Sequence, residues 1–174
     1  MTIGTTTERP AIQIGEVVLK TARFEAMNRW WQTMLGVSLY LESERFAFRR
    51  LAGEYPYTQT LVIFNQPELA ASVSAGPGLD HVQFRHASFS ALLDRYETLR
   101  DLGITPYRTM NHGPSTSFYY RDPDGNGVEL SAVNFPTEAE YARFVASEAF
   151  KRNISGAPVD ADDLVEVPER CAAG

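Results

Sequence analysis

Ionisable side chains stand in the middle of two apolar segments that have the composition of β-strands. His81 lies in LDHVQFR, and Glu129 lies in GVELSAV. Because strand side chains alternate between faces, His81 shares a face with Gln83, and Glu129 shares a face with Ser131. A charge within a small domain is costly unless it is paired or bound to a metal ion. His81 and Glu129 therefore indicate a functional site that uses one of these two solutions.

A third carboxylate, Glu16, occupies a comparable place near the start of the chain. It is followed directly by Val17 and Val18 in the run AIQIGEVVLK, where a charge is unexpected. The remaining histidines are His86 and His112. His86 follows its strand, before Ala87-Ser88, and is predicted to be a surface residue or a neighbour of a helix cap. His112 stands in NHGP, ahead of a further strand.

These residues lie in two halves that share one order of elements, strand–helix–strand–strand–strand. In each half, apolar residues at spacings of three and four predict a helix, and a glycine ends it. The first half has strands over 11–20, 37–41, 46–51 and 58–65, and a helix with Phe24, Met27, Trp31, Met34 and Leu35, ended by Gly36. The second half has strands over 79–85, 104–110, 115–121 and 127–133, and a helix with Phe89, Leu92, Leu93, Tyr96 and Leu99, ended by Gly103. The repeated order suggests duplicated modules.

Connections and ends follow from composition. The Gly- and Pro-containing stretch 66–78 predicts a linker, and Asp122-Pro123-Asp124-Gly125 predicts a type I turn. Thr137 is the predicted N-cap of a further helix, and the acidic residues 154–174 predict an extended or partly disordered tail, or an arm on a partner subunit. We expect one structural domain overall, with modules over 11–66 and 79–134 and a C-terminal helix and extended tail over 135–174.

The overall composition excludes several classes of function. The formal net charge is −6 and no Lys/Arg-rich stripe is present, which argues against a nucleic-acid partner. Cys171 is the only cysteine, so a disulfide framework or a thiolate zinc site within one chain is excluded. No apolar run approaches the roughly 20 residues that span a bilayer, and the start of the chain does not resemble a signal peptide. A cytoplasmic protein without a membrane partner is expected.

The repeated order and the run SFYYRDPDGNGVEL, at residues 117–130, resemble the vicinal-oxygen-chelate superfamily of glyoxalases, bleomycin-resistance proteins and extradiol dioxygenases. The resemblance covers about residues 11–134. It implies an α+β fold in which two βαβββ modules form a half-open mixed β-barrel. It also implies metal ligands in the first strand of each module and in the last strand of the second, at Glu16, His81 and Glu129.

Within that superfamily, the second module is closest in pattern to single-domain extradiol, ring-cleaving dioxygenases. These enzymes carry a tyrosine ten residues before the glutamate ligand in a Ser-Phe-Tyr context, which Tyr119 matches. They also carry a histidine further upstream, for which His112 is the candidate, although it stands two residues closer to the tyrosine than the pattern expects. The resemblance implies that His112 acts as acid or base and that Tyr119 hydrogen-bonds the bound substrate or the oxygen intermediate.

The first module departs from the dioxygenase pattern at Glu16, where a histidine is usual. One histidine and two carboxylates make a harder, more anionic set, which would still suit Fe(II) or Mn(II) and also other divalent ions. The resemblance to the dioxygenases implies Fe(II), with Mn(II), Zn(II) or Ni(II) as alternatives. Glyoxalase I chemistry is disfavoured, because the strand Leu61–Asn65 lacks the further carboxylate of that branch.

Three functions remain open on this basis. The leading one is a metal-dependent, extradiol-type dioxygenase that acts on a catecholic substrate with O2, as a homodimer. The second is a metal-dependent, non-oxidative isomerase or lyase. The third is a metal-free binding or resistance protein that holds a flat molecule with the aromatic residues Trp31, Phe48, Tyr55 and Tyr57.

Overall fold

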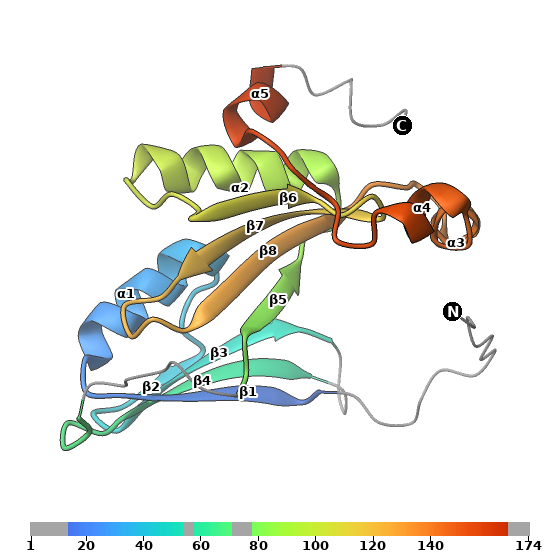
Figure 1. Ribbon diagram of the computed structural model, residues 1–174. Helices are drawn as coiled ribbons and strands as arrows, with labels where there is room; N and C mark the ends of the chain where they lie inside the picture. The colour runs from blue at the N-terminus through green and yellow to red at the C-terminus, as the bar shows by residue number, and fades with distance from the viewer. Residues whose placement is uncertain (1–13, 54–57, 71–77, 167–174) are drawn as a thin grey trace. The chain divides into compact units, whose positions relative to one another are not determined.

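The chain folds into two β-sheets, and a long helix covers one face of each sheet (Figure 1). The structure, a computed structural model, describes residues 14–53, 58–70 and 78–166. The contacts divide it into two units, one of residues 1–77 with 122–125 and one of residues 78–121 with 126–174. None of the helices in the described ranges is long and apolar enough to cross a membrane.

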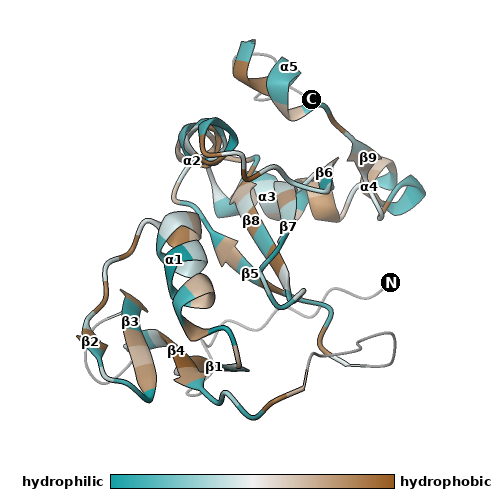
Figure 2. Cartoon of the chain, turned by 90° about the vertical axis from the view of Figure 1, so that its left-hand side faces the viewer, coloured by the Kyte–Doolittle hydropathy of each residue, from teal (hydrophilic) through white to brown (hydrophobic). Residues whose placement is uncertain are grey.

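The first unit is a four-stranded sheet with strand order β1-β4-β3-β2. Its elements are β1 (Glu16–Thr21), α1 (Phe24–Leu35), β2 (Leu41–Glu42), β3 (Phe46–Ala52) and β4 (Gln59–Asn65). β1 runs parallel to β4, and the other pairs are antiparallel. The predicted stripe of α1 is buried at Met27, Trp31 and Met34, and the helix contacts β4, whose residues are largely hydrophobic (Figure 2). Gly36 ends the helix with φ +64°, as its place in the sequence predicts.

A buried arginine ties α1 to the sheet. Arg49 of β3 is fully buried, and its guanidinium donates to the Asn28 side chain at 3.1 Å and to the Asn28 carbonyl at 2.9 Å. Burial lowers the pKa of Arg49, because the charged form loses its water. The turn Asp122–Gly125, which groups with this unit, is closed by a hydrogen bond from the Gly125 amide to the Asp122 carbonyl.

The second unit is a five-stranded sheet with strand order β5-β8-β7-β6-β9. Its elements are β5 (His81–Arg85), α2 (Phe89–Asp101), β6 (Arg108–Asn111), β7 (Ser115–Arg121), β8 (Gly127–Val133), α3 (Glu138–Val145), α4 (Glu148–Arg152), β9 (Ala157–Pro158) and α5 (Ala161–Glu166). β5 runs parallel to β8, which repeats the β1–β4 pairing of the first unit. The predicted α+β class with two βαβββ modules is therefore confirmed.

Two strands are shorter than their sequences predict. Of the stretch 37–41 only Leu41 belongs to a strand, and the strand predicted over 104–110 begins at Arg108. Pro106 lacks a backbone N–H for a ladder, which accounts for the late start of β6. The start of the first predicted strand, at residues 11–13, lies outside the described residues.

The C-terminal segment differs most from expectation, because residues 154–166 are folded onto the second unit. β9 pairs with β6, and α5 lies against α2. Within α5, Ala161 and Leu164 are buried, and Asp162 forms an ion pair with Arg100 at 2.6 Å. Asp162, one of its acidic residues, therefore makes a specific docking contact.

Candidate active site on the second sheet

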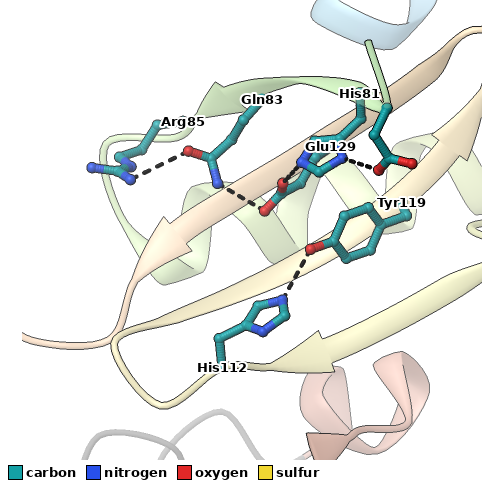
Figure 3. A network of polar contacts seen from close by, with 7 residues as sticks. His81, Gln83, Arg85, His112, Tyr119 and Glu129 are labelled. Atoms are coloured by element: carbon teal, nitrogen blue, oxygen red, sulfur yellow. Dashed lines mark hydrogen bonds and ion pairs between the residues drawn. The ribbon is translucent and has the colours of Figure 1, made fainter. Parts of the chain in front are cut away.

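The candidate site lies on the face of the second sheet that is opposite α2. Side chains alternate along β5 and β8, so that Val128 and Leu130 are buried on the helix side while His81, Gln83 and Glu129 share the other face. Gln83 is the register partner of Glu129. Tyr119 of β7 is the partner of Glu129 on its other side. Figure 3 shows these side chains gathered across three neighbouring strands.

His81 stands between two carboxylates. Its Nε2 lies 2.7 Å from Oε2 of Glu129, and its Nδ1 lies 2.6 Å from Oδ2 of Asp80 (Figure 3). Glu129 is only 3% exposed, and a buried carboxylate is costly without a partner such as the His81 imidazole. The hydrogen bond from His81 lowers the pKa of the exposed Asp80 carboxyl below its usual value. The pair His81–Glu129 that the sequence predicts is therefore brought together, with an orienting carboxylate behind the imidazole.

The second oxygen of Glu129 is also held. Nε2 of the Gln83 side chain donates to Oε1 of Glu129 at 2.8 Å, and the Arg85 guanidinium donates to Oε1 of Gln83 at 3.3 Å (Figure 3). Gln83 thus fixes the plane of the carboxylate and leaves Oε2 directed at His81.

Tyr119 and His112 form the second pair of the site. The Tyr119 hydroxyl lies 2.9 Å from Nε2 of His112 (Figure 3), and the side chain of Tyr119 is 6% exposed. Burial raises the pKa of Tyr119 above its ordinary value, and the negative charge of the nearby Glu129 carboxylate raises it further. Tyr119 is therefore a neutral phenol at physiological pH and has a proton to donate. Its ring also lies edge-on to the His81 ring, with 5.4 Å between centroids, which links the two pairs.

A tight turn explains how His112 reaches Tyr119 in spite of its short spacing. Only His112, Gly113 and Pro114 connect β6 to β7, and the His112 backbone amide closes this turn by donating to the Ser115 carbonyl at 2.8 Å. Gly113 has φ +88°, a conformation that favours glycine. The side chain of Asn134, which directly follows β8, donates to the Asn111 side chain and to the Gly113 carbonyl and so holds the turn.

Two donor atoms of this site fit a divalent metal ion. Adjacent ligands at about 2.1 Å from a metal, at roughly a right angle, lie about 3 Å apart. Nε2 of His81 and Oε2 of Glu129, at 2.7 Å, need to move by only a few tenths of an ångström to reach that spacing. Among the residues that the structure describes, no three His, Cys, Asp or Glu side chains form a closed metal-binding group.

Glu16, the third predicted ligand, belongs to the first unit, where it begins β1. Its side chain is exposed, on the same face of the strand as Val18. Its part in a metal site stays a prediction.

Other residues singled out from the sequence lie away from this network. His86 follows β5 and donates its backbone amide to the Ser131 carbonyl. Trp31 is 1% exposed and its indole N–H donates to Asp122 at 3.3 Å within the first unit, so it belongs to the core. Phe48 is half-buried, whereas Tyr55 and Tyr57 lie outside the described residues.

Three residues that contact the site, Asp80, Arg108 and Ser155, were not predicted from the sequence. Asp80 directly precedes His81, so its contact with the ring could have been suspected from adjacency. Arg108 is the register partner of Tyr119, and its guanidinium carbon lies 5.1 Å from the centroid of that ring. Ser155, whose carbonyl oxygen lies 3.0 Å from Nδ1 of His112, left no signal in the sequence.

Comparison with known proteins places this site in a family context. Residues 13–130 match the model of the Glyoxalase/Bleomycin resistance protein/Dioxygenase superfamily. The chain is 33% identical over 163 residues to biphenyl-2,3-diol 1,2-dioxygenase 2 of Rhodococcus globerulus, covering 93% of this chain and 83% of that protein. It is 34% identical over 146 residues to biphenyl-2,3-diol 1,2-dioxygenase 3 of the same organism, covering 83% and 75%.

Among solved structures, a glyoxalase/dioxygenase from Nostoc punctiforme superposes with a TM-score of 0.59 at 14% identity, over 76% of this chain and 99% of that one. At this level of identity the likeness concerns the fold alone. The family model and the curated relatives agree with it, and the chain therefore belongs to the Glyoxalase/Bleomycin resistance protein/Dioxygenase superfamily.

Proposed function

We propose that this protein is a metal-dependent, extradiol-type dioxygenase that cleaves the ring of a catecholic substrate with O2. The observation that carries the proposal is the pairing on one sheet face of a histidine–carboxylate set, His81 with Glu129, and a proton-transfer pair, Tyr119 with His112. The names of the relatives from Rhodococcus globerulus support the same reaction class.

His81 and Glu129 would hold the metal, with Glu16 of the first unit as the third ligand. Fe(II) is the proposed ion, and Mn(II), Zn(II) and Ni(II) are alternatives for this harder ligand set. A bound metal would supply the template for the vicinal oxygens of the substrate and for O2, and the route for electrons between them. Asp80 and Gln83 would orient the two ligands, since each holds the atom that does not face the metal.

Tyr119 and His112 would take the proton of a substrate hydroxyl. When Nε2 of His112, 2.9 Å away, accepts the phenolic proton of Tyr119, the Tyr119 oxygen keeps lone pairs for a second hydrogen bond. A substrate hydroxyl that donates to this oxygen could pass its proton to Tyr119 while Tyr119 passes its own to His112. His112 is therefore the proposed general base and Tyr119 the relay.

The exposed face of β1 suits an aromatic ligand. Val18, on the face of Glu16, is the register partner of Val62, and Val62 is the partner of Phe48. The exposed Val18 and the half-buried Phe48, on either side of the buried Val62, are the proposed contact surface for an aromatic ring. We also propose that the protein is a homodimer, which sedimentation of the purified protein would test. Its proposed location is the cytoplasm.

The proposal is tested by elemental analysis and oxygen uptake. Protein purified without oxygen should contain one divalent metal ion per chain, and His81→Ala should lose it. An oxygen electrode with a panel of catechols, including biphenyl-2,3-diol, should record uptake that matches the product formed. A metal content near zero in both aerobic and anaerobic preparations would contradict the proposal. Turnover without oxygen uptake would indicate an isomerase or lyase, and tight metal-free binding of the aromatic panel would indicate a binding protein.

A further inference from the structure

The C-terminal segment reaches back to the histidine of the candidate site. The Ser155 carbonyl oxygen lies 3.0 Å from Nδ1 of His112, the ring nitrogen that does not face Tyr119. Ser155 stands beyond residues 13–130, which the family model matches. The second partner of His112 is therefore supplied by a part of the chain outside the common domain.

This part of the chain is anchored at β9 and directly after it. Met110 pairs with Pro158 and Asn111 with Ala157 in the β6–β9 ladder. The Thr109 hydroxyl also donates to the Val159 carbonyl.

Further along, Asp162 of α5 accepts a hydrogen bond from the Tyr96 hydroxyl at 2.9 Å and pairs with Arg100 of α2. The carbonyl of Ser155 is thus held by a ladder and a docked helix.

Gly156 permits the close approach of this backbone to β6. It has φ +76°, and a Cβ at this position would lie 2.3 Å from the Asn111 carbonyl oxygen and 2.6 Å from Cα of His112. Both neighbours are backbone atoms, so a side chain at position 156 would force the segment away from His112. A glycine is required here for space as well as for its dihedral angle.

The contact decides which nitrogen of His112 carries the proton. A carbonyl oxygen can only accept, so in the neutral ring Nδ1 must be the donor and Nε2 the acceptor. Tyr119 must then donate to Nε2 and not accept from it.

We propose that the Ser155 carbonyl, brought into reach by Gly156, fixes His112 in the Nδ1–H tautomer and thereby sets the direction of proton transfer from Tyr119. Ser155 and Gly156 are positioning residues, and their catalytic meaning rests on the function proposed above.

Nitrogen-15 NMR of the full-length, metal-free protein tests the tautomer directly. In the neutral ring of the wild-type protein, His112 should show a protonated Nδ1 and an unprotonated Nε2. A His112→Gln variant assigns the signals among the three histidines. Gly156→Ala should shift His112 toward the Nε2–H form, whereas Ser155→Ala should keep the wild-type pattern, because it retains the carbonyl.

Gly103→Ala is the matched control. Gly103 has φ +75°, almost the angle of Gly156, but a Cβ there would meet nothing within 4 Å. This variant carries the same backbone cost without the clash, and His112 should keep its tautomer.

An Nε2–H ring in the wild-type protein, or an unchanged tautomer in folded Gly156→Ala, would overturn the proposal. If Gly156→Ala does not fold, the wild-type spectrum still decides.

Turnover supplies an independent measurement. With biphenyl-2,3-diol and the metal-loaded protein, Gly156→Ala should lower kcat by about tenfold at unchanged metal content, and Gly103→Ala should not. Failure of all catechols to react would refute the proposed function while leaving the tautomer assignment to the spectra.

Discussion

Gln83 and Glu129 face each other across β5 and β8, and the Gln83 amide donates to Oε1 of the carboxylate at 2.8 Å. This single hydrogen bond decides which oxygen of Glu129 is available to His81. In the metal site proposed above, a carboxylate held in this way would bind the ion through one oxygen with little reorganisation.

Gln83→Leu should therefore weaken metal binding without unfolding the protein. The variant frees Oε1 of Glu129, and loss of such an orienting contact typically costs about 10- to 100-fold in metal affinity. Competition with a chelator measures the affinity. Arg85→Ala, which removes only the longer 3.3 Å contact behind Gln83, should have a smaller effect. Equal losses in the two variants would show that the amide does not orient the carboxylate.

Tyr119→Phe should lower kcat by about 100-fold, the lower end of what a positioned proton-transfer group contributes. The substitution keeps the ring that packs against His81 and removes only the hydroxyl that contacts His112. Oxygen uptake with a catechol gives the rate, and thermal unfolding checks the fold. The control is Tyr107→Phe, because Tyr107 is a neighbouring tyrosine that is 53% exposed. A wild-type rate in Tyr119→Phe would remove Tyr119 from the mechanism.

Tyr120→Phe should stabilise the protein by about 1 kcal/mol, since an unsatisfied buried polar group is costly. The Tyr120 side chain is 1% exposed, and its hydroxyl has no hydrogen-bond partner in the part of the chain that the structure describes. Urea unfolding at neutral pH measures the free energy of unfolding. A loss of stability in the variant would mean that this hydroxyl has a bound partner, such as water.

The buried hydroxyl of Tyr120 should also make the free energy of unfolding fall in alkali. Burial raises the pKa of Tyr120 above that of an exposed phenol, and electrostatic interaction with Tyr96 adds a smaller rise. Above about pH 10 the unfolded chain loses this proton while the folded chain keeps it, so the free energy of unfolding falls as pH rises. Urea unfolding over this range should show a shallower fall in Tyr120→Phe than in the wild-type protein. Parallel curves would contradict the assignment.

Asn28→Ala should destabilise the first unit by about 2 kcal/mol, because it removes an acceptor from the fully buried Arg49 guanidinium. Arg49→Met should cost less, since it removes the buried charge together with its need for partners. Urea unfolding of both variants compares them. Greater damage from Arg49→Met would mean that the charge itself stabilises the unit.

Periodicity and glycine positions predicted much of the fold. The stripe from Phe24 to Leu35 and the stop at Gly36 gave α1 with its bounds, because three- and four-residue spacing is specific to helices. The hairpin of β7 and β8 followed from the Asp122–Gly125 turn and its flanking strands. Strand alternation also predicted that His81 and Gln83 share a face.

The rest depends on contacts between distant residues, which a single sequence does not reveal. Asp162 stabilises α5 only because Arg100 and Tyr96 lie opposite it on α2, 62 and 66 residues earlier. The Ser155 carbonyl is a backbone group, which every residue type has, so the amino-acid sequence could not indicate its contact with His112. Trp31 was one candidate for a ligand surface, but its amphipathic helix turns it into the core.

The β6–β9 pairing imposes an order on folding. β6 and β7 are joined by a short turn and can pair as soon as both have left the ribosome, as local hairpins do within microseconds. The bond from His112 to Ser155 spans 43 residues and cannot form before the segment that holds Ser155 and β9 has been synthesised. During synthesis, the histidine of the candidate site therefore acquires its second partner late, after the sheet that carries it has formed.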